Sequence, residues 1–502
     1  MEAPTFMFGI VDYLASLFIF VIGLMFLILV FIYIVDVSQT KHAVRRNFPV
    51  IGRLRGVFER LGEFFRQYFF ALDREELPFN RAERNWVYRA SKSIDNTVAF
   101  GSTRDLKPIG TLLFVNTPFP VLGQDATPIH DITIGPNCSH PYTTRSLINI
   151  SAMSYGAISK PAVIALSRGA KQAGCWLNTG EGGLTSYHLE GGADLVFQIG
   201  TAKYGVRDKH GHLDNDKLCE VANHQQVKMF EIKLSQGAKP GKGGILPGSK
   251  VTQEISRIRG IPVLQDSISP NRHPEIETIT DILDMVQRVR NTTGKPVGFK
   301  TVIGSYEWID ELCVAIKKRG IIDGAPDFIS IDSADGGSGA APMSLLDYVG
   351  LPISESLPIT IDILEKHGLK ERIKVIASGK LITPAEVAWA YCVGADFVAT
   401  ARGFMFALGC IQALQCNKNT CPTGITTHNR RLQKGLNPDD KSIRVTNYAN
   451  NLMHEVCVIA HSCGVRGPRE LNRNHVRIVT QDGVSVPVGD IYVNAYNRSV
   501  NR

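Results

Sequence analysis

Beyond about Leu147, short apolar runs alternate with longer segments whose apolar residues recur at helical spacing. A strand followed by a helix, repeated to this length, predicts a parallel sheet, and the α/β fold that fits it is a (β/α)8 TIM barrel. The candidate strands exceed the eight of a barrel by one, and we expect Leu195–Ile199 to be an excursion outside it. The candidates are Leu147–Ile150, Trp176–Asn178, Leu195–Ile199, Met229–Leu234, Pro262–Gln265, Val297–Lys300, Phe328–Ile331, Val375–Ala377 and Phe397–Thr400.

The segment Tyr13–Val35 contains no charged residue and is dominated by Leu, Ile, Phe and Val. As a helix it is long enough to cross the ~30 Å hydrocarbon layer of a membrane. Glu2 and Asp12 before it, and its length, argue against a cleaved signal peptide, which leaves a buried core helix as the alternative. Positive charge flanks only its C-terminal side, so that side is expected in the cytoplasm. We therefore predict a single-pass protein of the inner membrane with a cytoplasmic catalytic domain.

The stretch Arg53–Leu72 places aromatic residues at roughly helical spacing, with Arg and Glu between them. Such a helix could lie on anionic membrane lipid, or it could pack on the barrel or on another subunit of a homo-oligomer. The pattern leaves both possibilities open. The predicted organisation is a tail (1–12), a transmembrane helix (13–35), a basic juxtamembrane region (36–110), the barrel (111–425) and a small C-terminal extension (426–502) that contains a hairpin at Val476–Ile478 and Val484–Val488.

Charge and cysteine content restrict the partners and the compartment. The net charge of +8 is modest and gathers just after the apolar segment, and no nucleic-acid motif or base-stacking platform accompanies it. We therefore expect no nucleic-acid partner. Ten cysteines in 502 residues do not form the framework of a small secreted protein, which favours reduced thiols and a reducing compartment.

Three cysteines near the C-terminus carry the most specific chemistry. Cys410, Cys416 and Cys421 have the spacing C-x5-C-x4-C, and Pro422 follows directly. This arrangement is typical of iron–sulfur ligands, although it is neither the C-x2-C-x2-C run of bacterial ferredoxins nor a C-x2-C zinc pair. Three local ligands suit a cluster with one open corner. The alternative is a set of buried or unpaired cysteines.

The segment Cys410–Gly424 resembles the [3Fe-4S] segment of the synthase domain of glutamate synthase. The resemblance runs from about Ile150 to Cys421, and it implies an FMN-binding TIM barrel whose three cysteines hold a [3Fe-4S] cluster. The motifs that carry it, in the same order as in the family, are Ile150–Gly156, Asn178–Gly183, Gln236–Gly244, Leu246–Gly248, Lys300, Asp335–Ala340 and Ala407–Cys410.

Signature residues follow the predicted strands, where barrel enzymes place their chemistry. Gly336, Gly337 and Gly379 let backbone N–H groups close on a phosphate, and Arg402 could add positive charge to that site. The resemblance identifies the ligand as FMN. The residues that we expect to contact it are Ser151, Ala152, Met153, Ser154, Asn178, Lys300, Asp335, Gly336, Gly337, Gly379, Lys380, Ala401 and Arg402.

Two residues are predicted to be catalytic. Lys300 ends a buried strand, where an unpaired ammonium group is costly, so it should stabilise an anionic reduced flavin or hold a substrate carboxylate. A salt bridge to a loop acid is the alternative for Lys300. Glu181 lies among glycines and could bind an amine or move a proton, or it could cap its loop.

A third group of polar residues points to the substrate. Lys233, Gln236 and Lys239 share one loop and suit a dicarboxylate such as 2-oxoglutarate. For Lys239 a surface position is the alternative.

The resemblance implies reductive amination of 2-oxoglutarate to L-glutamate, with hydride from FMN and electrons that reach it through the cluster from ferredoxin or a reductase subunit. The chain begins Met1-Glu2 and runs into the apolar segment, so we expect no glutaminase domain. Lys242 stands where the family has an acid, and Ala334 where it has His, which puts the substrate in doubt. Two alternatives stay open: a membrane-linked amine or amino-acid oxidoreductase, such as an N-methylglutamate synthase, that exchanges electrons with another carrier; and an electron-transfer or scaffold subunit without activity.

Overall fold

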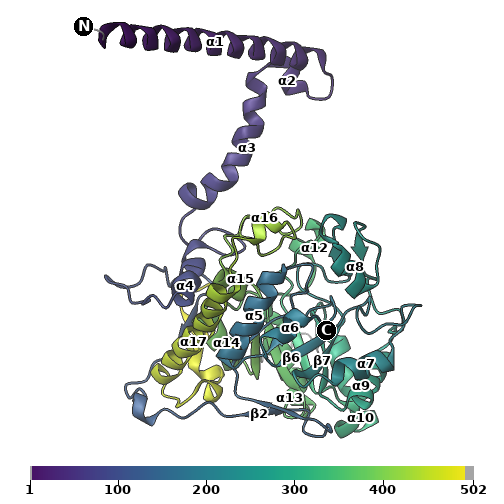
Figure 1. Ribbon diagram of the computed structural model, residues 1–502. Helices are drawn as coiled ribbons and strands as arrows, with labels where there is room; N and C mark the ends of the chain where they lie inside the picture. Colours follow the sequence, from purple (N-terminus) through teal and green to yellow (C-terminus); the bar gives the residue numbers. More distant parts are fainter. Residues whose placement is uncertain (1–2, 492–502) are drawn as a thin grey trace. The chain divides into compact units, whose positions relative to one another are not determined.

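The computed structural model describes residues 3–491, without the side chains of residues 3–8, 63 and 64. The chain forms two compact units, residues 1–82 and residues 83–502. Figure 1 shows the helices of the first unit and the α/β body of the second. The two units are described separately below.

The first unit is helical. Its long helix α1 (Ala3–Ser38) includes a 30-residue candidate span, Gly9–Ser38, in which an 18-residue window has a mean hydropathy of 3.2 and no buried residue. Length and composition would let this helix cross a membrane, and a signal sequence passes the same test. The shorter elements that follow are α2 (Ala43–Asn47), the 3₁₀ turn η1 (Ile51–Arg53), α3 (Leu54–Phe65) and the π-helical turn η2 (Arg66–Phe70).

The second unit is built on a closed barrel of eight parallel strands, which confirms the predicted TIM barrel. Around the barrel the order is β10-β11-β12-β13-β4-β5-β6-β7, so every strand pairs with its neighbour in sequence and β13 closes onto β4. The strands are β4 (Ile148–Ile150), β5 (Leu177–Asn178), β6 (Leu195–Ile199), β7 (Val227–Lys233), β10 (Val297–Thr301), β11 (Phe328–Asp332), β12 (Lys374–Ser378) and β13 (Phe397–Thr400).

The sequence analysis placed the wrong apolar segment outside the barrel. Leu195–Ile199 is the barrel strand β6, fully buried and paired with both β5 and β7. Pro262–Gln265 is the run outside the barrel: it forms a turn in which Leu264 has φ +59°. Val263 and Leu264 are exposed, so the apolar residues of this run do not contribute to the core.

Several of the helices that alternate with the strands begin at polar caps. Ser159 accepts the Ala162 N–H at the start of α5, and Thr278 forms a reciprocal capping box with Asp281 at the start of α9. The helices of this unit are α4 (Arg81–Ser91), α5 (Lys160–Ala173), α6 (Ser186–Glu190), α7 (Asn215–Ala222), α8 (Gln253–Arg259), α9 (Ile279–Thr293), α10 (Glu307–Arg319), α11 (Ile321–Gly324), α12 (Met343–Tyr348), α13 (Ile353–Lys366), α14 (Pro384–Cys392), α15 (Arg402–Leu408), α16 (Arg430–Gln433) and α17 (Pro438–Ser462).

Small sheets complete the body. The hairpin β2 (Ile132–Ile134) and β3 (Tyr142–Thr144) packs Ile134 and Tyr142 against Trp176, Phe328 and Phe397, which lie at or just before the starts of barrel strands. This hairpin therefore closes the amino end of the barrel and leaves the carboxyl end for chemistry.

The C-terminal part of the chain packs on the barrel. Helix α17 contacts α5, α14 and α15, and its Tyr448 hydroxyl donates to the Ile382 carbonyl over 2.9 Å. The predicted hairpin is confirmed as β14 (Val476–Val479) and β15 (Ser485–Pro487), which are antiparallel. Strand β14 also pairs with β1 (Leu112–Phe114), so the segment before the barrel and the segment after it form one sheet. The remaining strands, β8 (Ile245–Leu246) and β9 (Ser267–Ile268), form an antiparallel pair.

Candidate active site

A small pocket opens inside the barrel. Its apolar residues come from the strand interiors, and its polar residues include Ser151, Asn178 and Lys300, which the sequence predicted for the cofactor. The lining residues are Ile150, Ser151, Trp176, Asn178, Val196, Glu231, Lys300, Ser330, Ile376, Ser378 and Ala399. The polar side chains therefore converge on one point inside the barrel, next to its apolar core.

Lys300 lies in this pocket with its charge compensated. The residue is 7% exposed, and its Nζ lies 3.2 Å from Oδ2 of Asp332. Burial works against the ammonium group, but the charges of Asp332 and Glu231 outweigh it and raise the pKa of Lys300. Asp332 also accepts the Gly237 N–H over 2.9 Å. Lys300 thus both lines the pocket and forms a salt bridge, although its partner Asp332 ends the strand β11 and is not the loop acid of the predicted alternative.

Glu231 is a site residue that the sequence analysis missed. It lies on β7, is 3% exposed, and accepts hydrogen bonds from Asn178 Nδ2 (2.8 Å), Gln198 Nε2 (2.7 Å) and Ser330 Oγ (2.5 Å). Asn178 is thereby fixed, and its Oδ1 accepts the Gly180 N–H. The available signal was a glutamate inside an apolar run, since glutamate is rarely fully buried unless it is partnered.

Glu181 and Lys233 form an ion pair at the mouth of the barrel. Lys233 Nζ lies 2.8 Å from Glu181 Oε1 and 2.5 Å from Gln236 Oε1. Burial alone would raise the pKa of Glu181, but the charges of Lys233, Lys239 and Arg259 lower it below the ordinary value, so this carboxylate is ionised.

Two glycines make room for the Glu181 side chain. A Cβ on Gly244 would lie 2.4 Å from its Oε1, and a Cβ on Gly200 would lie 2.5 Å from its Cβ. The glycines around this carboxylate therefore set its position.

Lys239 is buried, so the surface alternative for it is wrong. The residue is 3% exposed, and within residues 3–491 its ammonium group has no hydrogen bond or ion pair. Burial, with repulsion from Lys233, lowers the pKa of Lys239 to about 8. A cation held this way at the mouth is available to an anion.

The glycine loops after β11 and β12 converge with the start of α15. A Cβ on Gly337 would lie 3.0 Å from Arg402 Nε, and a Cβ on Gly379, where φ is +111°, would lie 2.4 Å from the side chain of Ser333. Lys380 forms a 2.7 Å ion pair with Asp335 beside them. These loops can follow a phosphate only because they lack side chains.

The loop after β4 connects this region to the cysteine segment. Three successive carbonyls, of residues 155–157, each accept from a basic side chain: Arg259 NH2 (3.0 Å), His428 Nε2 (2.8 Å) and Lys250 Nζ (2.6 Å). Lys250 also donates to the Cys416 carbonyl over 3.2 Å. Lys250 therefore links the loop that carries Met153 to the segment that carries the predicted cluster ligands.

The three cysteines lie close enough to influence one another. Burial, with the charges of Cys416 and Cys421, raises the pKa of Cys410 to about 12. Polar groups contact two of the sulfurs: the Gln412 N–H donates to Cys410 Sγ over 3.5 Å, and the Thr423 hydroxyl lies 3.3 Å from Cys421 Sγ. Within residues 3–491, however, no three His, Cys, Asp or Glu side chains are arranged as a metal site.

The backbone between the cysteines takes unusual conformations. Gln412, Leu414 and Asn419 all have φ between +53° and +59°. Such strain in non-glycine residues gathers at functional loops. The three cysteines and the strained loop between them suit an iron–sulfur cluster. In the described residues, however, the cysteine side chains are not arranged around a common metal position.

Comparison with known proteins identifies the family. The family model for the conserved region in glutamate synthase matches residues 124–466, which is more than half of the chain. The chain belongs to the glutamate synthase family. Its members are oxidoreductases that act on CH–NH₂ donors, and the resemblance inferred from the motifs is confirmed.

Several relatives support this assignment. The glutamate synthase large subunit-like protein YerD of Bacillus subtilis (strain 168) is 38% identical over 518 residues, covering 95% of this chain and 98% of YerD. The archaeal glutamate synthase (NADPH) of Methanocaldococcus jannaschii is 34% identical over 333 residues, covering 66% of this chain and 61% of that protein. The chain thus spans about three fifths of the latter. Among solved structures, mandelate oxidase with benzoyl-formic acid is 16% identical with a TM-score of 0.45, covering 74% of this chain and 87% of that one.

Two positions that depart from the glutamate synthase motifs lie near the mouth. Ala334 is 7% exposed, and its backbone pairs with Ala238 and Leu351, so no side chain of the size of histidine occupies that place. Lys242 is half-buried, and its charge helps to lower the pKa of Lys239. The mouth is therefore more positive than the family pattern predicts.

Proposed function

We propose that this chain carries out reductive amination of 2-oxoglutarate to L-glutamate, or its reverse, at an FMN in the barrel mouth. The observation that supports it is the grouping of paired and unpaired charges there: Lys300 with Asp332, Glu181 with Lys233, and the buried, unpartnered Lys239. A dicarboxylate that becomes an amino acid needs fixed cations for its carboxylates and one carboxylate for its nitrogen.

The residues around the pocket fit FMN. Gly336, Gly337 and Gly379 leave the space that a Cβ would fill, and Arg402 lies against Gly337 to add charge beside a phosphate. Ser151, Asn178 and Lys300 line a small pocket inside the barrel and would contact the bound cofactor. When bound, FMN supplies the hydride chemistry. The chain supplies a cation, Lys300, that favours the anionic reduced form.

The remaining roles belong to the mouth. Lys239 and the Lys233–Gln236 pair would hold carboxylates, because desolvated ammonium groups bind them strongly. Ionised Glu181 would hold the incoming ammonium or iminium nitrogen and accept its proton.

Cys410, Cys416 and Cys421 would hold a [3Fe-4S] cluster, which supplies single electrons from a ferredoxin or a reductase subunit. The support is the donor set, the polar contacts to two of the sulfurs and the strained loop. Lys250 and His428 would keep this segment next to the loop after β4, where Met153 and Ser154 lie.

We infer that α1 anchors the protein in the inner membrane as a single span, with the catalytic unit in the cytoplasm. The support is the 30-residue candidate span, with its exposed apolar window, and the basic residues that follow it.

A second candidate is a membrane-linked amine or amino-acid oxidoreductase, such as one that forms N-methylglutamate, with electrons passed to or from another carrier. Lys242 and Ala334 favour it, because both alter the mouth where the nitrogen donor would enter.

The deciding experiment supplies each nitrogen donor to the same protein. Full-length protein, purified in detergent and reduced with dithionite under anaerobic conditions, is given 2-oxoglutarate with ¹⁵N-ammonium or with methylamine, and the products are identified by mass spectrometry. ¹⁵N-glutamate supports the first function and N-methylglutamate the second. Formation of neither product refutes 2-oxoglutarate as the substrate and leaves an oxidoreductase for another amine. The Lys300→Ala variant should lose turnover while it keeps its flavin; unaltered activity of a whole complex that contains this variant would instead indicate a scaffold subunit.

A further inference from the structure

The helix after the apolar segment carries an exposed apolar stripe that the catalytic account does not use. Placed at about 100° intervals around α3, Leu54, Val57, Phe58, Leu61 and Phe65 fall on one face. These five side chains are 41–66% exposed. The stripe continues into η2, where Tyr68, Phe69 and Phe70 are also exposed. Soluble surfaces rarely leave so continuous an apolar stripe uncovered.

Basic residues flank this stripe. On the same helical wheel, Arg55 and Arg66 lie on one side of it and Arg60 on the other. Arg55 pairs with Glu59 over 2.9 Å, but both side chains are about two-thirds exposed, so the pair contributes little in water. The basic residues of positions 41–70 outnumber the acidic ones: Lys41, Arg45, Arg46, Arg53, Arg55, Arg60 and Arg66 against Glu59 and Glu63.

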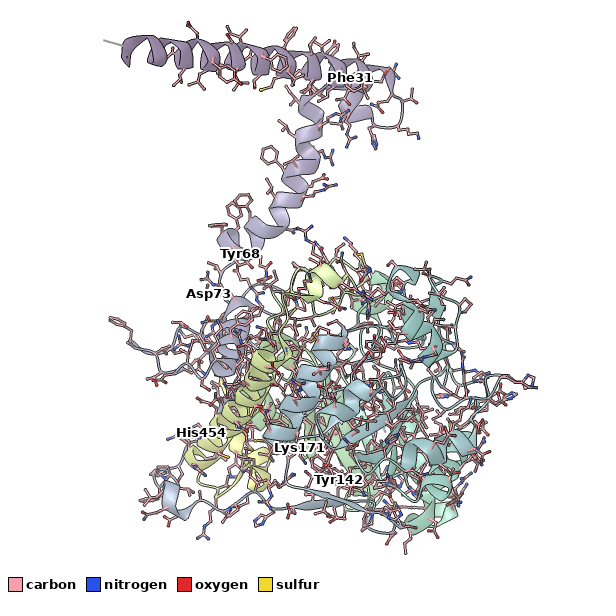
Figure 2. The ribbon with its side chains drawn as sticks, viewed as in Figure 1. Phe31, Tyr68, Asp73, Tyr142, Lys171 and His454 are labelled. Carbon is pink, nitrogen blue, oxygen red and sulfur yellow. The ribbon has the colours of Figure 1, made fainter. Side chains whose placement is uncertain are left out.

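An ion pair between a buried carboxylate and a partly exposed arginine ties the start of α3 to the end of α1. Asp36 is 1% exposed and accepts the Arg53 NH2 group over 2.7 Å and the Val50 N–H over 3.0 Å. The bidentate geometry and the backbone bond fix the turn between the helices. Within this unit, α3 runs across the line of α1 instead of continuing it (Figure 1). Figure 2 shows Phe31 on α1 and Tyr68 on η2 projecting from the helices.

We propose that the stripe Leu54–Phe70 is a docking face for an anionic lipid surface, held next to the membrane by the Asp36–Arg53 pair. The inference rests on the proposal that α1 spans the membrane. An apolar stripe with basic flanks lies at the boundary of headgroups and acyl chains, and each basic residue there adds attraction to anionic lipid. Arg55, Arg60 and Arg66 would repel the same helix of a second copy, which favours lipid as the occupant.

The test is hydrogen–deuterium exchange of the full-length protein in nanodiscs of phosphatidylcholine alone or mixed with phosphatidylglycerol. The amides of α1 should be protected in both. The amides of residues 54–70 should exchange about tenfold more slowly, or slower still, in the anionic nanodiscs. Equal exchange of residues 54–70 in the two lipids would overturn the proposal. Exposed α1 amides would instead refute the membrane span itself, so the two failures are distinguishable.

Variants of the stripe and of its basic flanks test whether these side chains cause the protection of the amides of residues 54–70. Phe58→Ser with Leu61→Ser, and Arg55→Gln with Arg60→Gln and Arg66→Gln, should each remove the protection of residues 54–70 and leave that of α1. Glu59→Gln, away from the stripe, is the matched control and should retain it. Protection that persists in the triple arginine variant would mean that α3 packs on protein and would overturn the proposal.

Discussion

Lys233 Nζ lies 2.8 Å from Glu181 Oε1, and both side chains are largely removed from water. Removing either partner would leave the other as a buried charge without its ion-pair partner. Gly200 and Gly244 fix the position of Glu181, and Lys233 also donates a hydrogen bond to Gln236. The mouth thus holds a rigid carboxylate directed at the site where we propose that the substrate nitrogen arrives.

Glu181→Gln should lower kcat by about 100-fold, because a neutral amide of the same shape cannot accept a proton. The flavin content should stay unchanged, since Glu181 is not among the residues expected to contact FMN. Steady-state kinetics and the absorbance of released flavin measure the two effects. Glu220→Gln, an exposed change on α7, is the control. A kcat within twofold of wild type would remove Glu181 from the chemistry.

The buried Lys239 should make the KM for 2-oxoglutarate depend on pH. Because its pKa is lowered to about 8, its ammonium group loses its proton as the pH rises through that value, and its attraction for a carboxylate is lost. The KM for 2-oxoglutarate should therefore rise above pH 8. Lys239→Met should raise KM at pH 7 by about tenfold or more and flatten its pH dependence. The exposed Lys171→Met is the control, and a Lys239→Met enzyme with the wild-type pH profile would contradict the assignment.

Lys250 is expected to hold the cysteine segment in place. It bonds the carbonyls of Ala157 and Cys416 at once, and methionine can replace its length but neither bond. Lys250→Met should lower the iron content per chain several-fold and leave the flavin content near normal. Iron analysis and electron paramagnetic resonance measure the first, and exposed Lys434→Met is the control. Full iron content with an unaltered spectrum would show that the segment does not need this bridge.

His188 predicts a pH dependence of stability. Burial lowers its pKa to about 4 in the fold, against about 6.5 when unfolded, so the unfolded chain binds more protons between these values. Stability should therefore be intact above pH 6.5 and fall as the pH drops toward 4, by up to about 3 kcal/mol from this residue.

His188→Asn keeps an acceptor for the Thr185 cap and should make the free energy of unfolding less sensitive to acid. Unfolding by urea at pH 5 and pH 7 measures the difference, with exposed His224→Asn as the control. An equal loss of stability in wild type and His188→Asn would place the acid sensitivity elsewhere.

The barrel could be predicted because its strands are short, apolar and followed by helical patterns. The sequence could not show which of two short apolar runs, Leu195–Ile199 or Pro262–Gln265, belongs to the barrel. Only the pairing with β5 and β7 identifies the first as a barrel strand. Glu231 escaped notice for a related reason. Its partners Asn178, Gln198 and Ser330 come from three other strands, and no local pattern links them.

The candidate site could be predicted only in part. Residues at strand ends, such as Lys300 and Glu181, were found because barrels place function there. Lys239 is buried without a partner because of the way its loop folds over the mouth of the barrel. The spacing of Lys233 and Lys239 in the sequence does not predict this burial. The same is true of Lys250, whose bridge joins residues far apart in the sequence.

The most direct test of the central claim follows the flavin itself. Full-length protein is purified in detergent, reduced under anaerobic conditions and mixed rapidly with 2-oxoglutarate and ammonium, while the flavin absorbance is recorded. The account predicts fast reoxidation that requires both compounds and is lost in Glu181→Gln. Flavin that stays reduced with 2-oxoglutarate and either ammonium or methylamine would contradict it and would move the substrate to another class of amine.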